Sequence, residues 1–125
     1  METIITDAGR ALSHPEERLD CAVRALAAFD REHLTYAQAH DIFEGLGRKQ
    51  RHKSYCTRNA LWTIGYALIN VSMNMSVTKF ARLNPIGRYF IHVRGHCFVL
   101  ENGNALDLQP VSGKRQVLAY AKFRE

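Results

Sequence analysis

The dipeptide Asn102-Gly103 constrains the fold of this chain more than any other feature of its sequence. Asn-Gly between two runs of β-forming residues is the strongest local signal for a two-residue hairpin turn. Counting outward from this turn places Phe98 opposite Asp107. Side chains alternate along a strand, so His96 shares a face with Phe98. We therefore expect Asp107 to project on the face of His96, one diagonal step away and within reach of it.

Patterns elsewhere predict helices first and a sheet afterwards, which is typical of the α+β class. The chain has 125 residues, and we expect one domain over 1–125, with N-terminal helices packed on a C-terminal antiparallel sheet. Residues 1–12 are expected to be a loose or edge segment and 47–54 a mobile basic loop. Helices are predicted over about 15–30, 35–46, 57–68 and 76–83, with strands over 69–75, 88–94, 96–101, 104–109 and 116–122. The strands on either side of Gly95 could also be one long strand bent at that glycine.

Composition narrows the class of protein. Hydrophobic residues make up 46% of the chain, which is ordinary for a globular domain. There is neither an apolar run long enough to span a membrane nor the pattern of a secretory signal, so we expect a soluble, cytoplasmic protein. The three cysteines, Cys21, Cys56 and Cys97, lack zinc-like spacing and argue against a disulfide framework.

The charges are unevenly distributed along the chain. The formal net charge is +5, yet all twelve acidic residues lie outside 45–100, a segment that holds nine Lys or Arg. The densest part, residues 48–58, could attract nucleic acid or an acidic partner. The simplest interpretation of these residues is a solvated loop.

Cys21 is the first candidate nucleophile. If Asp20 is an N-cap, Cys21 sits in the first helical turn, where the positive end of the helix lowers a thiol pKa. An imidazolium from His96 would lower it further and create an activated Cys–His pair. A competing start signal, Ser13 with Glu16, would instead place Cys21 in the middle of the helix.

Three segments together carry a family resemblance: Asp20–Ala27, Arg88–His96, and the Asn102-Gly103 hairpin with Asp107. Over roughly residues 18–110 the chain resembles small papain-like cysteine peptidase domains of short phage and bacterial proteins. It is similar to the peptidase domain that trims bacteriocin leader peptides.

This resemblance implies a cysteine at the start of a central helix, a histidine on a sheet strand, and an Asp or Asn on the next strand. The matching positions are Cys21, His96 and Asp107. The implied activity is thiolate attack on a peptide or amide bond of a peptide or protein substrate, without a cofactor. If the protein is phage-encoded, it would work in the host cytoplasm.

The sequence departs from the family pattern at two positions. The leader-trimming peptidases have an oxyanion-hole glutamine six residues before the cysteine, where this chain has Pro15, and a glycine after it, where this chain has Ala22. The first alternative is therefore a catalytically inactive papain-like module, such as a phage-encoded one, that binds or inhibits a partner. The second is a basic protein associated with nucleic acid.

Several other residues have more than one interpretation. Gln109 faces His96 in the hairpin register and could orient the ring or donate to an oxyanion. Cys56 also precedes a helix and is the alternative nucleophile. Cys97 should point away from the face of His96 into the core.

Two further alternatives concern a metal and a charge. His92 and His96 with a cysteine could form a zinc site, although no tight ligand spacing supports it. Arg24 lies three residues after Cys21, so it could stabilise a thiolate or form a structural salt bridge.

Overall fold

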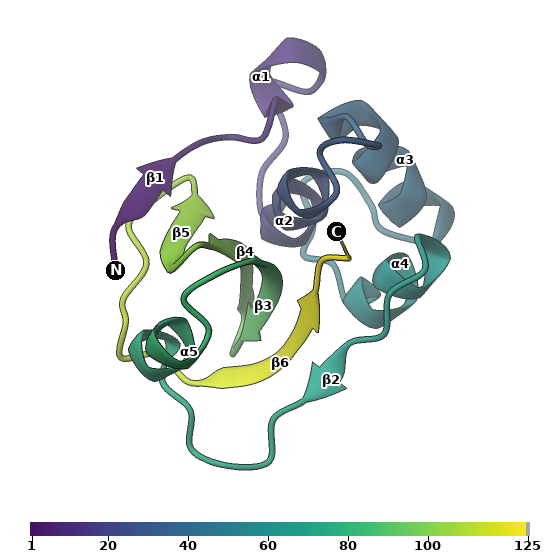
Figure 1. The fold of residues 1–125 in the computed structure, drawn as a ribbon. Helices are drawn as coiled ribbons and strands as arrows, with labels where there is room; N and C mark the ends of the chain where they lie inside the picture. Colours follow the sequence, from purple (N-terminus) through teal and green to yellow (C-terminus); the bar gives the residue numbers. More distant parts are fainter. Residues whose placement is uncertain (125) are drawn as a thin grey trace.

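The secondary structure of this chain is that of an α+β protein (Figure 1). The computed structural model describes residues 1–124. Among these residues the elements are, in chain order, β1 (Thr3–Ile5), α1 (Arg10–Ser13), α2 (Cys21–Phe29), α3 (Tyr36–Gly45), α4 (Thr57–Thr63), β2 (Ile69–Asn70), α5 (Val77–Leu83), β3 (Arg88–Val93), β4 (His96–Glu101), β5 (Asn104–Asp107) and β6 (Val117–Lys122).

The strands form one sheet in the order β1-β5-β4-β3-β6-β2. The predicted hairpin register is confirmed, with Glu101 opposite Asn104. Asn102 and Gly103 both have positive φ angles, 49° and 80°, as a tight hairpin turn requires. The expectation of a purely antiparallel C-terminal sheet is wrong in one respect. The N-terminal strand β1 pairs in parallel with β5, so the sheet is mixed.

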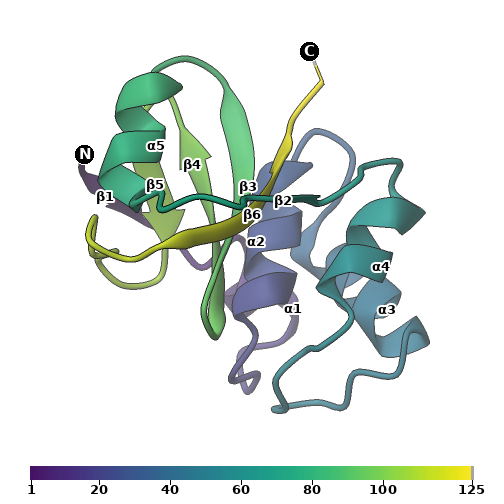
Figure 2. The ribbon, with the colours of Figure 1, turned by 90° about the horizontal axis from the view of Figure 1, so that it is seen from below.

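Helices cover both faces of the sheet (Figure 2). One cluster of buried side chains joins α2, α3 and α4 to residues of β3, β4 and β6, and a second joins α5 to the opposite face. Helix α2 lies between the sheet and the other two helices, and seven of its nine residues are buried. A helix that is apolar on nearly all sides is stable only in such a central position.

The first long helix is shorter than predicted because the segment before it is held in another conformation. It begins at Cys21, not near residue 15, whereas Ser13 is the last residue of α1. Leu19 adopts the left-handed region at φ 52°, and two carboxylates of this segment, Glu17 and Asp20, are buried. These buried charges bind groups far along the chain, which a local helix signal does not record.

Three other boundaries of helices and strands differ from the predicted ones for local reasons. Arg94 and Gly95, the latter at φ 71°, form a hairpin turn between β3 and β4, so the alternative of one bent strand is wrong. Strand β5 ends at Asp107, whose carboxylate accepts a hydrogen bond from the N–H of Leu108 as the chain turns away. Helix α4 ends at Thr63, just before Gly65 with its φ of 91°.

The basic loop 47–54 is anchored, contrary to the expectation of a mobile segment. The buried carboxylate of Glu17 accepts hydrogen bonds from Arg48 Nη1 at 2.9 Å and from the N–H of Arg51 at 2.5 Å. It also lies 2.6 Å from His40 Nε2. Arg48 is itself buried, so the interpretation of this residue as part of a solvated surface is wrong.

None of the helices in residues 1–124 has the length and apolar character needed to cross a membrane.

Replacing the buried carboxylate should destabilise the fold. In Glu17→Gln, the buried Arg48 loses its charge partner, and we expect the free energy of unfolding to fall by about 3 kcal/mol. The exposed neighbour provides a matched control, because Glu16→Gln should change the free energy by less than about 0.5 kcal/mol. Denaturant titration measures both values, and equal stability of the two variants would contradict the assignment.

Acid should weaken the same anchor. Burial alone would raise the pKa of Glu17, but its hydrogen bonds to Arg48, Arg51 and His40 lower that pKa to about 2. A carboxyl whose pKa is lowered by folding stabilises the fold above its unfolded pKa, and this contribution is lost as the pH falls toward about 2. The stability gap between wild type and Glu17→Gln should therefore narrow below about pH 4.

Candidate active site

Cys21 is the first residue of α2, and Asp20 occupies the N-cap position, as one of the two sequence interpretations predicted. The Asp20 side chain does not cap the helix, however. Its carboxylate accepts hydrogen bonds from Arg10 Nη1 at 3.1 Å, Arg24 Nε at 3.1 Å and the Tyr36 hydroxyl at 2.8 Å. Cys21 is thus held in the first helical turn by contacts of its neighbour, with its sulfur near the positive helix end.

His96 and Asp107 face each other across the ends of two strands. His96 opens β4 and Asp107 closes β5, and His96 Nε2 lies 2.5 Å from Asp107 Oδ2. The prediction that these side chains share a face is confirmed. The other carboxylate oxygen, Oδ1, accepts a hydrogen bond from Arg24 Nη1 at 2.8 Å. Asp107 is therefore held through both of its oxygens.

Arg24 connects the two halves of this arrangement. Its guanidinium binds Asp20 at one end of α2 and Asp107 at the end of β5. The interpretation of Arg24 as a residue of a structural salt bridge is confirmed, and the sequence did not reveal that its second partner is Asp107.

Cys21 and His96 line the same cleft, and each shifts the pKa of the other. A hydrogen bond from the Cys97 thiol, together with the hydrogen bond and charge of His96, lowers the pKa of Cys21 to about 4 against the effect of burial. Hydrogen bonds to Asp107 and Cys21 raise the pKa of His96 to about 9, although burial acts the other way. Between these values the pair is a thiolate beside an imidazolium.

Two buried groups maintain that charge distribution. Burial raises the pKa of Asp107, but His96, the N–H of Leu108 and the charge of Arg24 together lower it below its usual value, so the group remains a carboxylate. The pKa of Cys97 is raised by its hydrogen bond to Cys21 and by burial, so Cys97 stays a thiol and can donate to the neighbouring sulfur. Cys97 lies in the core opposite the face of His96, as predicted. Helix α2 covers that face of the sheet, so the Cys97 sulfur lies beside Cys21. The alternation of side chains along β4 could not reveal this contact.

The cleft around these side chains has a volume of about 760 Å³. It includes Leu19, which is 59% exposed, and Gln109, which is exposed two residues beyond the end of β5. The predicted pairing of Gln109 directly opposite His96 is wrong, because the ladder between β4 and β5 ends before it. Gln109 nevertheless remains in the cleft. The N–H of Cys21 has no hydrogen-bond partner in the described residues, as expected for the first position of a helix.

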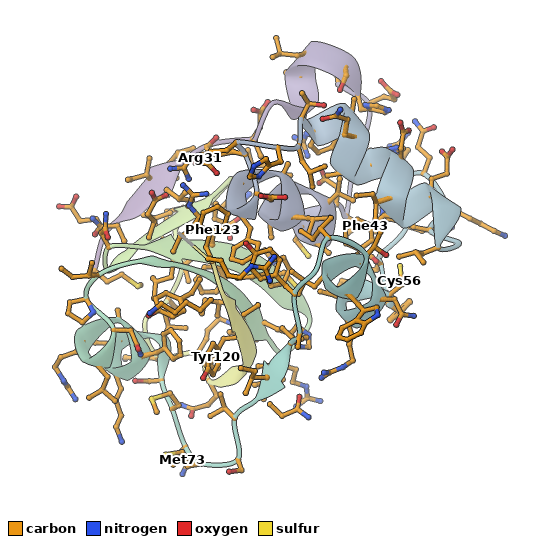
Figure 3. All side chains as sticks on the ribbon, turned by 45° about the vertical axis from the view of Figure 1, so that its right-hand side comes forward. Arg31, Phe43, Cys56, Met73, Tyr120 and Phe123 are labelled. Carbon is orange, nitrogen blue, oxygen red and sulfur yellow. The ribbon has the colours of Figure 1, made fainter. Side chains whose placement is uncertain are left out.

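The other candidate residues lie elsewhere. Cys56 is at the N-cap of α4, on the helical side of the molecule (Figure 3), and it lines a hollow that does not include His96. His92 lines another hollow beside Arg58. Residues 1–124 contain no group of three or more His, Cys, Asp or Glu side chains placed to hold a metal ion, so the zinc alternative has no support there.

A larger groove of about 980 Å³ lies along α1, α2 and α3, and its lining is mostly apolar. Cys21, His96 and Asp107 do not line this groove. The larger of the two cavities is therefore not the one that holds the candidate catalytic residues.

Comparisons of this chain with protein-family models, with curated protein sequences and with solved structures found no match.

The charge state of the pair predicts the pH dependence of Cys21 alkylation. Iodoacetamide reacts with thiolates, so the reaction of Cys21 should remain fast down to about pH 5, because its pKa is about 4. In His96→Gln the imidazolium is removed, and the midpoint of the rate profile should move up toward the ordinary value of about 8.5. Peptide mass spectrometry resolves the alkylation of each cysteine. An unchanged midpoint in His96→Gln would show that His96 does not hold the thiolate.

Proposed function

We propose that this chain is a papain-like thiol hydrolase that cleaves a peptide or amide bond. Cys21 would be the nucleophile, His96 the proton carrier, and Asp107 the residue that orients His96. The observation that carries the proposal is the position of Cys21 at the start of α2, in one cleft with the hydrogen-bonded His96–Asp107 pair. This arrangement supplies a nucleophile, a base and an orienting group, which are the parts that thiol acyl transfer requires.

The reaction follows from the charge states. The Cys21 thiolate attacks the carbonyl carbon, and the tetrahedral intermediate collapses as the His96 imidazolium gives its proton to the leaving amine. A thioester on Cys21 remains. His96, now neutral, takes a proton from water, and the resulting hydroxide attacks the thioester, releasing the acid and restoring the thiolate. Asp107 holds Nε2, so Nδ1 is the nitrogen left to face the sulfur and the substrate.

Oxyanion stabilisation would come from two donors. The free N–H of Cys21 is the first, and the side-chain amide of Gln109 in the same cleft is the second. Pro15 cannot supply the donor that the related peptidases place there, and Pro15 does not line the cleft. Losing one such donor in a serine protease costs about 10²–10³ in rate, so the position of Gln109 matters for turnover.

Pro15 is also the observation that favours the second candidate, an inactive papain-like module that binds or inhibits a partner. A general nucleic-acid function receives less support, because the cationic segment is partly used inside the fold. Arg48 is buried against Glu17, and Arg58 donates to the carbonyl of Leu68 and to Asn70.

Cleavage of a proteome-derived peptide library tests the proposal. Wild type should generate new peptide termini, and Cys21→Ala and His96→Ala should not. Cys56→Ala serves as the matched control and should cleave like wild type, since Cys56 lies outside the cleft. Asp107→Asn should reduce turnover by up to about 10⁴, the scale of the corresponding change in a serine protease.

Absence of cleavage by both wild type and Cys21→Ala would contradict the hydrolase proposal and favour the inactive module. Equal cleavage by both proteins would assign the activity to a contaminant and contradict it too.

A further inference from the structure

Three cations around the cleft have no carboxylate partner. Arg18, Lys53 and Arg115 line the cleft and are exposed, and none of them takes part in a salt bridge among residues 1–124. Their side chains donate only to backbone carbonyls. A hydrogen bond to a carbonyl positions a cation but does not neutralise its charge.

The carboxylates of the cleft are already engaged. Asp20 binds Arg10 and Arg24, and Asp107 binds Arg24 and His96. The two carboxylates therefore face three positive groups inside the site, namely Arg10, Arg24 and His96. The three exposed cations at the rim of the cleft, Arg18, Lys53 and Arg115, add three more positive charges. The cleft has an excess of positive charge even after the thiolate of Cys21 is counted.

The unpaired cations stand on both walls of the cleft. Arg18 belongs to the segment that leads into Cys21 and donates to the carbonyls of Pro15 and Glu17. On the other wall, Lys53 Nζ donates to the carbonyl of Gly95 at 2.9 Å.

Arg115 completes the second wall, since its guanidinium donates to the carbonyl of Arg94. Lys53 and Arg115 thus hold the two residues of the turn that leads directly into His96. A substrate bound in the cleft over Cys21 and His96 would have cations on both sides of its reacting bond.

We propose that the substrate is an acidic peptide segment, with carboxylate side chains on both sides of the bond that is cleaved. This inference rests on the proposed hydrolase function and specifies its substrate class. A cleft lined by charge of one sign focuses its field and concentrates ligands of the opposite sign.

The lining favours a peptide over a nucleic acid. Proteins that bind single strands combine cations with aromatic rings on which bases stack. The residues described around this cleft include no Phe, Tyr or Trp. Its aliphatic contributions, from Leu19, Leu108 and Val111, suit the side chains of a peptide instead.

Two alkylating reagents that react with thiolates but differ in charge test the electrostatic potential around Cys21. Iodoacetate is anionic and iodoacetamide is neutral, and both alkylate the thiolate. The His96 imidazolium itself favours iodoacetate, so the informative quantity is the change in the iodoacetate-to-iodoacetamide rate ratio when the rim cations are removed. In the triple variant Arg18→Gln, Lys53→Gln, Arg115→Gln this ratio should fall about tenfold at low salt.

A matched triple variant removes the same charge elsewhere. Lys79, Arg82 and Lys122 are exposed and do not line the cleft, so their replacement by Gln should change the ratio by less than about twofold. Raising the salt concentration toward 1 M shortens the screening length to about 3 Å and should lower the wild-type ratio as the cleft variant does, without any mutation.

Protection of Cys21 against iodoacetamide then identifies the class of ligand. Hexaglutamate should slow the alkylation of wild type several-fold, whereas hexaglutamine should not, and the cleft variant should lose the protection. Protection by an oligothymidylate without protection by hexaglutamate would overturn the peptide assignment in favour of nucleic acid.

The outcomes separate the two proposals. Fast alkylation of Cys21 by both reagents, with the same ratio in both triple variants, would refute the acidic substrate and leave the hydrolase standing. Alkylation of Cys21 no faster than that of Cys56 at neutral pH would refute the hydrolase itself.

Discussion

The double ion pair of Arg24 is the interaction on which the site depends. Arg24 and Cys21 share the first turn of α2, and the Arg24 guanidinium binds both Asp20 and Asp107. The start of the helix and the end of β5 are therefore joined by one side chain that is largely removed from water. Because Asp107 gives one oxygen to Arg24 and the other to His96, its carboxylate cannot rotate without breaking a charged hydrogen bond. The His96 imidazole, which is hydrogen-bonded to this carboxylate, is therefore also held in one orientation.

Buried acids before α2 explain why Cys21, the candidate nucleophile, is the first residue of the helix. Glu17 and Asp20 are almost fully buried, and their partners come from α1, α2, α3 and the loop after α3. A continuous helix from residue 15 would carry these carboxylates to other positions and leave their cations unpaired. The polar network thus opposes the helical tendency of the segment, and Cys21 becomes the first residue of the helix, with a free N–H.

The sequence predicted the parts of the site that depend on local rules. A hairpin turn defines register over a few residues, so Asn102-Gly103 was enough to bring Asp107 to His96. The start of α2 could not be chosen between two capping signals, because the deciding contacts of Asp20 and Glu17 involve residues far along the chain. Likewise, alternation placed Cys97 in the core, but only the packing of α2 on that face shows that its thiol reaches Cys21.

The low pKa of Cys21 also limits what can accelerate the proposed reaction. A thiolate stabilised by Cys97, His96 and a helix end is fully formed at neutral pH, but its intrinsic nucleophilicity falls as its pKa falls. Activation of the sulfur therefore cannot be the main source of rate. Catalysis would depend on the orientation of His96 and on donors to the oxyanion, as electrostatic stabilisation usually does. Under the proposed function, such catalysis would depend on the side-chain amide of Gln109, which lines the cleft, whereas Pro15 does not.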